Sequence, residues 1–402
     1  MNKPIDPNLN NDKDLDILGS MNDENADDVS IEAKLSDEHS HHHGSHHHSS
    51  HHHRHHRHHR HHRHHKKKLP LIVRILITIL VIILAIAGIG AGVFFYLKNE
   101  GKNDMQSTEE QIVYEETIEH NGHKYVYNNN IVSIVFLGVD KRDINESSVI
   151  GTNGQADAVL VLTVDTKTGR SKIISVPRDT IVDVDLFDKN GKFLRSEPMQ
   201  LCLSYAYGDG RDSSAKNTLT SVSRILYDVP FNKYFVLDLD GIAPINDAIG
   251  GVRVKSLSDF PHLGINEGDM VRLKGDMTEQ YIRYRDVDAL DSSIDRSARQ
   301  VQYIQAFATQ AIPAVMNDFS IINRLYETAM NYSTTNIDVS NVTYLASLLA
   351  SKGVREFETE TLKGEMKLGD TPDENGIVYA EFYVDENAVL ETVLDTFYTQ
   401  VK

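Results

Sequence analysis

The longest apolar stretch of the chain lies close to, but not at, its N-terminus. Residues 75–97 contain no charged side chain. Coiled as an α-helix, this stretch is roughly 35 Å long, enough to cross the hydrocarbon core of a bilayer. We therefore predict a transmembrane helix over residues 69–98. A cleaved signal peptide fits less well, because the apolar stretch is too long and lies too far from the N-terminus.

Basic residues gather on the N-terminal side of this helix. Lys66, Lys67, Lys68 and Arg74 precede it closely, and most of the chain's 21 histidines lie between residues 39 and 65, interrupted by four arginines. The positive-inside rule then predicts that residues 1–68 form a disordered cytoplasmic tail and that the rest lies outside a membrane crossed once. The histidine tract has no cysteine and no fixed ligand geometry, so we interpret it as a flexible tail whose charge rises as pH falls.

The remaining three hundred residues alternate between two kinds of pattern. Residues 99–128 are polar and acidic and predict a stalk. Nearly continuous apolar residues at 131–138 and 156–164 predict strands buried on both faces, and 170–176 completes a hairpin with the second. Helical patterns follow and alternate with two further strands, at 233–239 and 376–384. This order predicts one α/β domain over residues 129–402, a central mixed β-sheet packed between helices.

Two aspartates stand at the ends of the first two predicted strands. Asp140 follows the strand at 131–138, at the carboxyl end where open α/β sheets bind ligands. Asp157 begins the next strand, so an antiparallel hairpin places it beside Arg178, which follows the third strand. Carboxylates this close repel unless a cation lies between them, and Mg²⁺ prefers one or two carboxylates with phosphate oxygens. The competing interpretation is that Asp140 only caps the following loop.

Four arginines lie between residues 281 and 300 in a region that is otherwise acidic. If residues 281–285 are extended, Arg283 and Arg285 point to the same face, and in a helix beginning near residue 294, Arg296, Arg299 and Gln300 share one side. Guanidinium forks suit phosphate oxygens, so the stretch predicts an oligophosphate clamp. A solvated helix face with surface ion pairs is the alternative.

The charge balance narrows the choice of partner. The formal net charge is −17, and acidic and basic residues are equal in number within the first hundred residues. The whole excess of negative charge therefore belongs to residues 101–402, and such a domain repels the phosphates of nucleic acid. We expect no nucleic-acid partner. Cys202 is the chain's one cysteine, so no intramolecular disulfide can form.

Six sequence blocks in this order, following a short tail and a single membrane helix, resemble the signature motifs of the LytR-CpsA-Psr family. The blocks are Phe-Leu-Gly-Val-Asp140-Lys-Arg, Ala-Asp157, Ser-Val-Pro-Arg178-Asp179, Asp-Ala-Ile-Gly250-Gly251-Val, Ile-Arg283-Tyr-Arg285 and Asp295-Arg296-Ser-Ala-Arg299-Gln300.

The resemblance implies a membrane-anchored phosphotransferase of a Gram-positive-type bacterium. Such an enzyme takes a glycopolymer of teichoic acid or capsular polysaccharide type from a polyprenyl pyrophosphate and joins it to peptidoglycan through a phosphodiester. It implies catalytic roles for Asp140, Asp157 and Arg178, with Mg²⁺ (or Mn²⁺) bound by the two aspartates. The lipid tail is expected in an apolar groove between sheet and helices. The residues implied to bind the pyrophosphate oxygens are Arg178, Arg283, Arg285, Arg296 and Gln300.

The sequence departs from the family's pattern at two positions where the family usually has a cationic residue. Gln155 stands where the family usually has arginine, and Gln200 where it usually has lysine, which implies a clamp with two fewer positive charges. Two other functions would use the same residues: a polyprenyl-pyrophosphate-binding or regulatory protein of wall synthesis without turnover, for which the family's transcriptional attenuator label was used, and a pyrophosphatase. In a transferase, Asp179 is the candidate carboxylate for deprotonating the attacking sugar hydroxyl.

Overall fold

The computed structural model describes residues 71–106, 117–142, 149–152, 154–285, 292–318, 320–352, 358–370, 372 and 376–401. The predicted cytoplasmic tail with its histidine tract, residues 1–68, lies outside the described residues, as does the connector 286–291 within the arginine-rich stretch.

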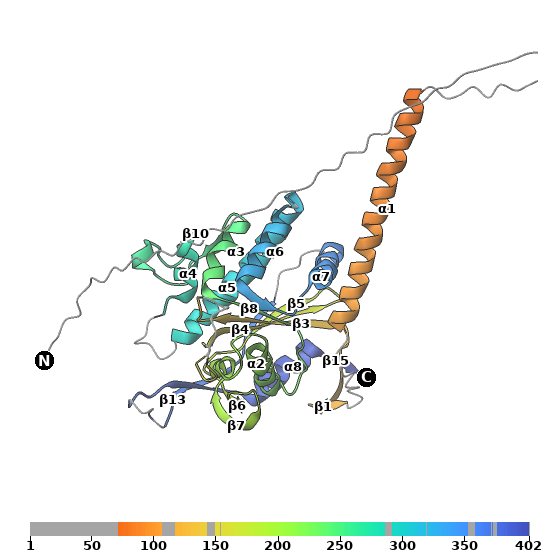
Figure 1. Cartoon of the computed structure of the whole chain (residues 1–402). Coiled ribbons are helices and arrows are strands. Elements are labelled where there is room, and N and C mark those ends of the chain that lie inside the picture. Colours follow the sequence, from red (N-terminus) through yellow and green to blue (C-terminus); the bar gives the residue numbers. More distant parts are fainter. Residues whose placement is uncertain are drawn as a thin grey trace, which may run out of the picture. The chain divides into compact units, whose positions relative to one another are not determined.

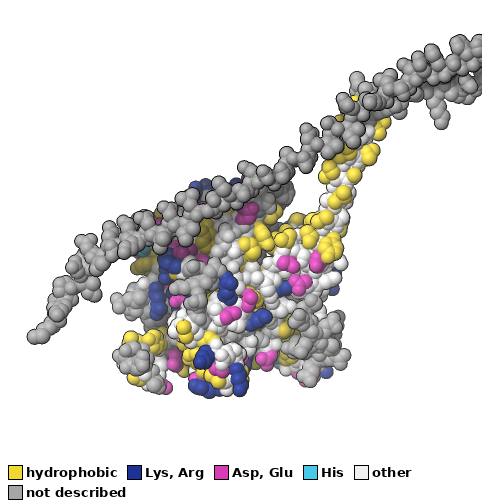
Figure 2. Space-filling view, viewed as in Figure 1, with side chains coloured by type: hydrophobic (Ala, Val, Ile, Leu, Met, Phe, Trp, Pro, Cys, Tyr) yellow, Lys and Arg dark blue, Asp and Glu magenta, His cyan; other side chains and the backbone are white. Residues whose placement is uncertain are grey.

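Helix α1 (Leu71–Gln106) is longer than the predicted span (Figure 1). From Ile75 to Tyr96 its large apolar side chains are exposed, and Figure 2 shows them as a hydrophobic surface along the helix. The helix is long and apolar enough to cross a membrane. A transmembrane helix was expected here from the apolar stretch, and the structure supplies one candidate within the described residues.

The last turns of α1 pack against α7 (Val339–Lys352). Gly101 lies so close to the Ser340 carbonyl oxygen that a Cβ atom would come within 2.0 Å of it. Asp104 accepts hydrogen bonds from Lys233 at 2.6 Å and from Asn341 at 2.8 Å. Residues 99–106, which the sequence assigned to a stalk, are therefore a helix end docked on the domain.

Two short strands also fall inside the predicted stalk. Strands β1 (Ile118–His120) and β2 (His123–Tyr127) pair antiparallel, and β2 pairs with β15 (Tyr398–Val401) at the other end of the chain. The stalk prediction is wrong for these residues. The second partner of β2, strand β15, lies more than 270 positions away, so no local pattern marks this hairpin as part of the fold.

The central sheet has six strands and is mixed. Strand β3 pairs antiparallel with β4 and parallel with β8, while β5 pairs antiparallel with β4 and parallel with β12. The three strands predicted at 131–138, 156–164 and 170–176 are confirmed as β3, β4 and β5. In sheet order the strands are β11 (Ser333–Thr335), β8 (Tyr234–Leu237), β3 (Ile131–Val139), β4 (Ala156–Asp165), β5 (Ser171–Ser175) and β12 (Glu358–Thr361).

Helices cover both faces of this sheet, as Figure 1 shows. One face packs on η1 (Leu201–Tyr207), α2 (Asp212–Ile225) and α8 (Glu386–Phe397), and these elements enclose the largest hydrophobic core. The other face carries α5 (Ser292–Asn317), with α3 (Ile242–Ala248), α4 (Asp276–Arg283) and α6 (Ser320–Tyr332) beside it. The predicted α/β domain with a mixed sheet between helices is confirmed.

Three antiparallel hairpins and two short 3₁₀ turns complete the described domain. The hairpins are β6 (Ile181–Phe187) with β7 (Phe193–Gln200), β9 (Val252–Lys255) with β10 (Met270–Leu273), and β13 (Gly364–Leu368) with β14 (Ala380–Val384). The 3₁₀ turns are η2 (Leu239–Gly241) and η3 (Pro261–Leu263).

The extended conformation considered for residues 281–285 is wrong. Helix α4 runs to Arg283, and Tyr284 leaves the helical conformation with φ −48° and ψ 135°. Tyr281 and Ile282 are both buried, which a strand with alternating faces does not allow when one face is solvated. Arg283 and Arg285 therefore sit on different pieces of backbone rather than on one strand face.

Candidate functional site

An irregularity in the β3–β4 pairing presents the first two aspartates. Gly138 pairs with Ala158 and Val139 with Ala156, so Asp157 is the extra residue of a β-bulge. A bulge bends the strand and re-aims its side chain, here at the edge where β3 ends. Asp140 continues β3 at that edge, and its Oδ1 accepts the N–H of Gln155 at 2.5 Å. Both aspartates thus lie at the predicted end of the sheet.

Arg178 joins this edge from the end of β5. Its Nη1 donates to Asp157 Oδ1, and its Nη2 donates to Gln155 Oε1 at 2.5 Å and to Cys202 Sγ at 3.1 Å. The antiparallel β4–β5 hairpin creates this contact, so the predicted juxtaposition of Asp157 and Arg178 is present. Gln155 acts here as a hydrogen-bond acceptor for Arg178.

Arg296 approaches the same carboxylate from the start of α5. The residue is only 6% exposed, and its Nη1 lies 3.3 Å from Asp157 Oδ2. Its Nε and Nη2 find no hydrogen-bond partner among the described residues. Burial, followed by the neighbouring charges of Arg178 and Arg285, lowers the pKa of Arg296 to about 10. A buried cation with two unused donors and two like-charged neighbours is a site that an anion would stabilise.

The other residues of the predicted clamp are arranged more loosely. Gln300 lies one helical turn after Arg296 and is buried on the same side of α5. Arg285 donates from Nε to Ser292 Oγ at 2.9 Å, close enough to influence Arg296. Arg283 is half exposed and pairs with Glu279 at 2.8 Å. These side chains surround the cluster without contacting Asp157 in the described structure.

Arg299 takes no part in this cluster, although the sequence placed it on the same side of the helix. Its guanidinium lies over the rings of Phe260 and Tyr284 and donates to the Tyr284 carbonyl. Burial lowers its pKa. Positions 296, 299 and 300 are close enough along α5 to share a side, so spacing alone does not separate them; the Arg299 side chain turns instead toward the rings of Phe260 and Tyr284.

An apolar cavity of about 500 Å³ extends from the cluster between the sheet and the helices of one face. Its walls are aliphatic and aromatic side chains of β3, β4, β8, α3, α5 and α6, among them Phe136, Leu160, Phe235 and Phe307. Polar side chains line it at Asp157, Arg283, Arg296 and Gln300. The cavity lies between the sheet and the helices, where the resemblance implied an apolar groove. Together, the cavity and the cluster fit an amphiphile with an anionic head.

The sequence pattern of the LytR_cpsA_psr family matches residues 93–394. The chain belongs to this family. Two LytR_cpsA_psr relatives are named polyisoprenyl-teichoic acid–peptidoglycan teichoic acid transferase TagU. The one from Bacillus subtilis is 27% identical over 327 residues, covering 80% of this chain and 94% of the relative. The one from Bacillus licheniformis is 26% identical over 263 residues, covering 65% and 76%.

A solved structure with the same fold is that of B. subtilis TagV. It superposes with a TM-score of 0.50 at 23% identity and covers 66% of this chain and 95% of the TagV chain. This likeness concerns the fold of the LytR_cpsA_psr domain.

Sequence reasoning missed a second layer of contacts in the LytR_cpsA_psr domain. Arg142, just after β3, binds Asp240 at 2.7 Å and Glu279 at 2.8 Å. Glu279 also holds Arg283, so one carboxylate joins two arginines from distant parts of the chain. Burial raises the pKa of Cys202 to about 11, which keeps it as a thiol at neutral pH.

The two aspartates at the sheet edge offer donors suited to a hard divalent cation. No group of three histidine, cysteine, aspartate or glutamate residues forms a metal site within the part of the chain that the structure describes. Asp140 is exposed, whereas both oxygens of Asp157 accept from arginines, so a cation there would take the place of one of these arginine contacts. Mg²⁺ is commonly held by one or two carboxylates together with phosphate oxygens and water. The residues therefore fit Mg²⁺ bound jointly with a phosphate ligand.

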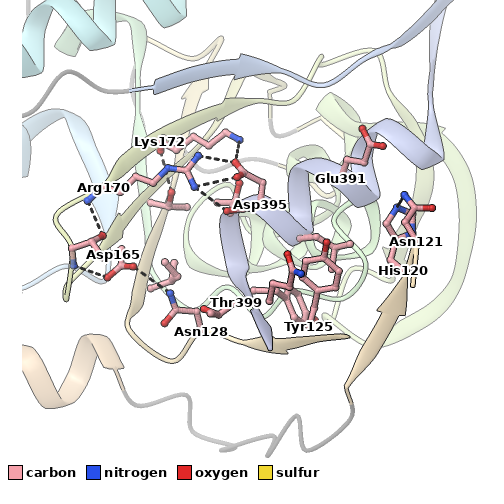
Figure 3. A pocket seen from close by; sticks show the side chains of 17 residues that line it. His120, Asn121, Tyr125, Asn128, Asp165, Arg170, Lys172, Glu391, Asp395 and Thr399 are labelled. Carbon is pink, nitrogen blue, oxygen red and sulfur yellow. Dashed lines mark hydrogen bonds and ion pairs between the residues drawn. The ribbon is translucent and has the colours of Figure 1, made fainter. Parts of the chain in front are cut away.

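A second cavity, of about 620 Å³, lies at the opposite end of β4 and β5 (Figure 3). Arg170 and Lys172 converge on Asp395 of α8, and Arg170 also binds Glu358 at 2.7 Å. Lys172 contacts Glu360 at 2.6 Å. Arg170, Lys172 and Asp395 pair with one another, so these charges do not indicate an ionic ligand.

Proposed function

We propose that this protein is a membrane-anchored phosphotransferase that joins a polyprenyl-pyrophosphate-linked glycopolymer to peptidoglycan through a phosphodiester. The observation that carries the proposal is buried Arg296, whose two unused donors lie where an apolar cavity meets charged side chains. A polyprenyl pyrophosphate has the matching parts, an oligophosphate head and an apolar tail. The names of the TagU relatives support the same donor and acceptor classes.

The cluster suits the charge changes of pyrophosphate cleavage. In this reaction the acceptor hydroxyl gives its proton to a carboxylate, for which Asp179 is the candidate, and its oxygen bonds to phosphorus. The bond from phosphorus to the bridging oxygen breaks, and polyprenyl phosphate leaves. Negative charge grows on the bridging and leaving oxygens, and guanidinium groups fixed in advance stabilise it without a covalent protein intermediate. Arg178 and Arg296 are already fixed through Asp157. Arg283, Arg285 and Gln300 complete the proposed pyrophosphate site.

Mg²⁺ (or Mn²⁺) belongs to the proposal as the ion held by Asp140 and Asp157. When bound, it neutralises phosphate charge and stabilises the leaving phosphate group. The protein's own contribution is to hold Asp157 on a bulge between two arginines, which fixes the carboxylate at the sheet edge.

The proposed topology is a single membrane crossing by α1, with the N-terminus in the cytoplasm and the domain outside. The basic residues before α1 support this orientation. The bilayer would then supply the lipid-linked donor on the side where the domain lies. Asp104 and Gly101 tie the end of α1 to the domain, which limits how far the domain can move from the membrane surface.

Product analysis tests the proposal. The full chain in lipid nanodiscs is incubated with a polyprenyl-pyrophosphate oligosaccharide, Mg²⁺ and peptidoglycan fragments, and products are identified by mass. We expect a phosphodiester-linked conjugate that disappears in Asp140→Ala and Arg178→Ala. Phosphate release without a conjugate would indicate a pyrophosphatase, and tight donor binding without turnover would indicate a binding or regulatory protein.

A further inference from the structure

The β13–β14 hairpin is attached directly beside the arginine cluster. The N–H of Phe382 in β14 donates to the carbonyl of Asp179 at 2.8 Å, and Phe382 forms a parallel bridge with Thr180. Gln200 Nε2 donates to the Ala380 carbonyl at 2.7 Å. Asp179 is the neighbour of Arg178 in sequence, so the hairpin is part of the rim of the candidate site.

One face of this hairpin carries an exposed aromatic row. Phe382 is buried, and alternation along β14 therefore turns Glu381 and Tyr383 to the opposite, outer face. Tyr379 directly precedes β14, and its carbonyl accepts the N–H of Gly369 at 2.9 Å, which continues the pairing of the hairpin beyond the two strands. Tyr379 is 51% exposed and Tyr383 is 45% exposed. Four residue steps along extended backbone place them about 14 Å apart, longer than one sugar ring.

The charged groups on the outer face satisfy one another. Lys367 of β13 lies 2.8 Å from Glu365 and 5.6 Å from the centre of the Tyr383 ring. The Tyr383 hydroxyl donates to Glu381 at 2.5 Å. The face therefore offers ring surfaces and paired polar groups rather than a field of one sign. Such a surface suits an uncharged chain of sugar rings, which presents both apolar ring edges and hydroxyls.

The position of the hairpin argues against the membrane as its occupant. The end of α1 contacts the other end of the β3–β4 pair, where Gln106 donates to Thr166 at 3.3 Å and Met105 packs on Val132. Asp179 and β14 lie at the opposite end, beyond a ten-residue strand of about 30 Å. The exposed tyrosines are therefore distant from the anchor's point of attachment.

We propose that the outer face of the β13–β14 hairpin binds the glycan strand of the acceptor and brings its hydroxyl to the arginine cluster. The face consists of Glu365, Lys367, Tyr379, Glu381 and Tyr383. This inference rests on the proposed transferase function and names the surface that its acceptor occupies.

The test measures acceptor and donor binding separately. The full chain in nanodiscs is titrated with peptide-free peptidoglycan oligosaccharides and, independently, with farnesyl pyrophosphate. The double variant Tyr379→Ala/Tyr383→Ala is expected to bind the oligosaccharide at least 10-fold more weakly and to bind farnesyl pyrophosphate unchanged. Tyr379→Phe/Tyr383→Phe keeps the rings and should retain most of the affinity. Tyr326→Ala, a tyrosine of similar exposure on α6, is the matched control.

Several outcomes overturn the proposal: no oligosaccharide binding by the wild type, an unchanged affinity in the double alanine variant, or an equal loss in Tyr326→Ala. Oligosaccharide binding that depends on the two tyrosines, without conjugate formation in the product assay, would instead refute the transferase and leave a glycan-binding surface. Where conjugate forms, the double alanine variant should raise the KM for the acceptor and leave kcat largely unchanged.

Discussion

Two clusters of arginine and carboxylate side chains lie at the two ends of β5, and they differ in how completely their bonds are made. At the start of β5, Arg170 forms charge-assisted bonds with Glu358 and Asp395, and these bonds raise its pKa. At the other end, Arg296 has one such bond and two unused donors, and burial lowers its pKa to about 10. Arginine and carboxylate side chains are thus fully paired at one end of β5 and incompletely paired at the other.

The comparison separates structural ion pairs from a binding site. A cluster that completes its own bonds holds elements together, here β5, β12 and α8, and gains little from a ligand. A cluster with unused buried donors is costly in the free protein and is stabilised when an anion arrives. Arginine content alone does not distinguish the two, because both clusters contain cations and carboxylates within contact distance.

The largest expected effect follows from removing a donor at the unsatisfied cluster. Arg296→Ala should lower the rate of conjugate formation at least about 100-fold, the usual cost of losing one preorganised donor to developing charge. Its thermal stability should stay close to that of the wild type, because the substitution removes a buried, incompletely paired charge. Arg170→Ala is the control and should keep a rate within about 2-fold for the folded fraction. Equal losses of rate in both variants would contradict the distinction between a binding site at Arg296 and structural ion pairs at Arg170.

The next effect concerns stability at the satisfied cluster. Lys172→Ala removes a cation that is only 8% exposed and leaves Glu360 and Asp395 facing each other. We expect a loss of about 2 kcal/mol, seen as a fall of roughly 5 °C in the Tm of the domain. Lys367→Ala, at an exposed pair, should change the Tm by less than about 1 °C. A similar fall in both variants would show that burial of the pair is unimportant.

A smaller effect is the pH dependence of the same cluster. Burial alone would raise the pKa of Asp395, but hydrogen bonds from Arg170 and Lys172 outweigh it and hold that pKa below its usual value; the pKa of Glu360 is lowered similarly through Lys172 and Thr392. Carboxyls with a depressed folded-state pKa stabilise the protein above their unfolded pKa of about 4, and this is lost as pH falls through the folded value.

Thermal unfolding between about pH 6 and pH 3 measures this effect. The Tm of the wild type should be nearly flat above pH 5 and fall below pH 4. Arg170→Ala should show a shallower fall, because its carboxyls are less depressed. An identical pH profile in wild type and variant would show that the ion pairs of Arg170 do not cause the loss of stability at low pH.

The sequence predicted the parts of the site that local patterns determine. Asp157 and Arg178 are 21 residues apart and belong to one hairpin, so strand length and turn position bring them together. Arg170 and Asp395 are 225 residues apart, and no spacing rule connects them. The extended conformation considered around Arg283 failed because Tyr281 and Ile282 are both apolar neighbours, a pattern that fits a short strand or a buried helix turn. In the folded domain both side chains are buried in the core, which the helix allows.

The most direct test of the account is the affinity of the full chain for farnesyl pyrophosphate, measured by calorimetry in nanodiscs for the wild type, Arg296→Ala and Arg170→Ala. The unused donors of Arg296 predict at least 30-fold weaker binding in Arg296→Ala and unchanged binding in Arg170→Ala. Unchanged affinity in Arg296→Ala, or a comparable loss in Arg170→Ala, would contradict the claim that unsatisfied buried donors mark the pyrophosphate site.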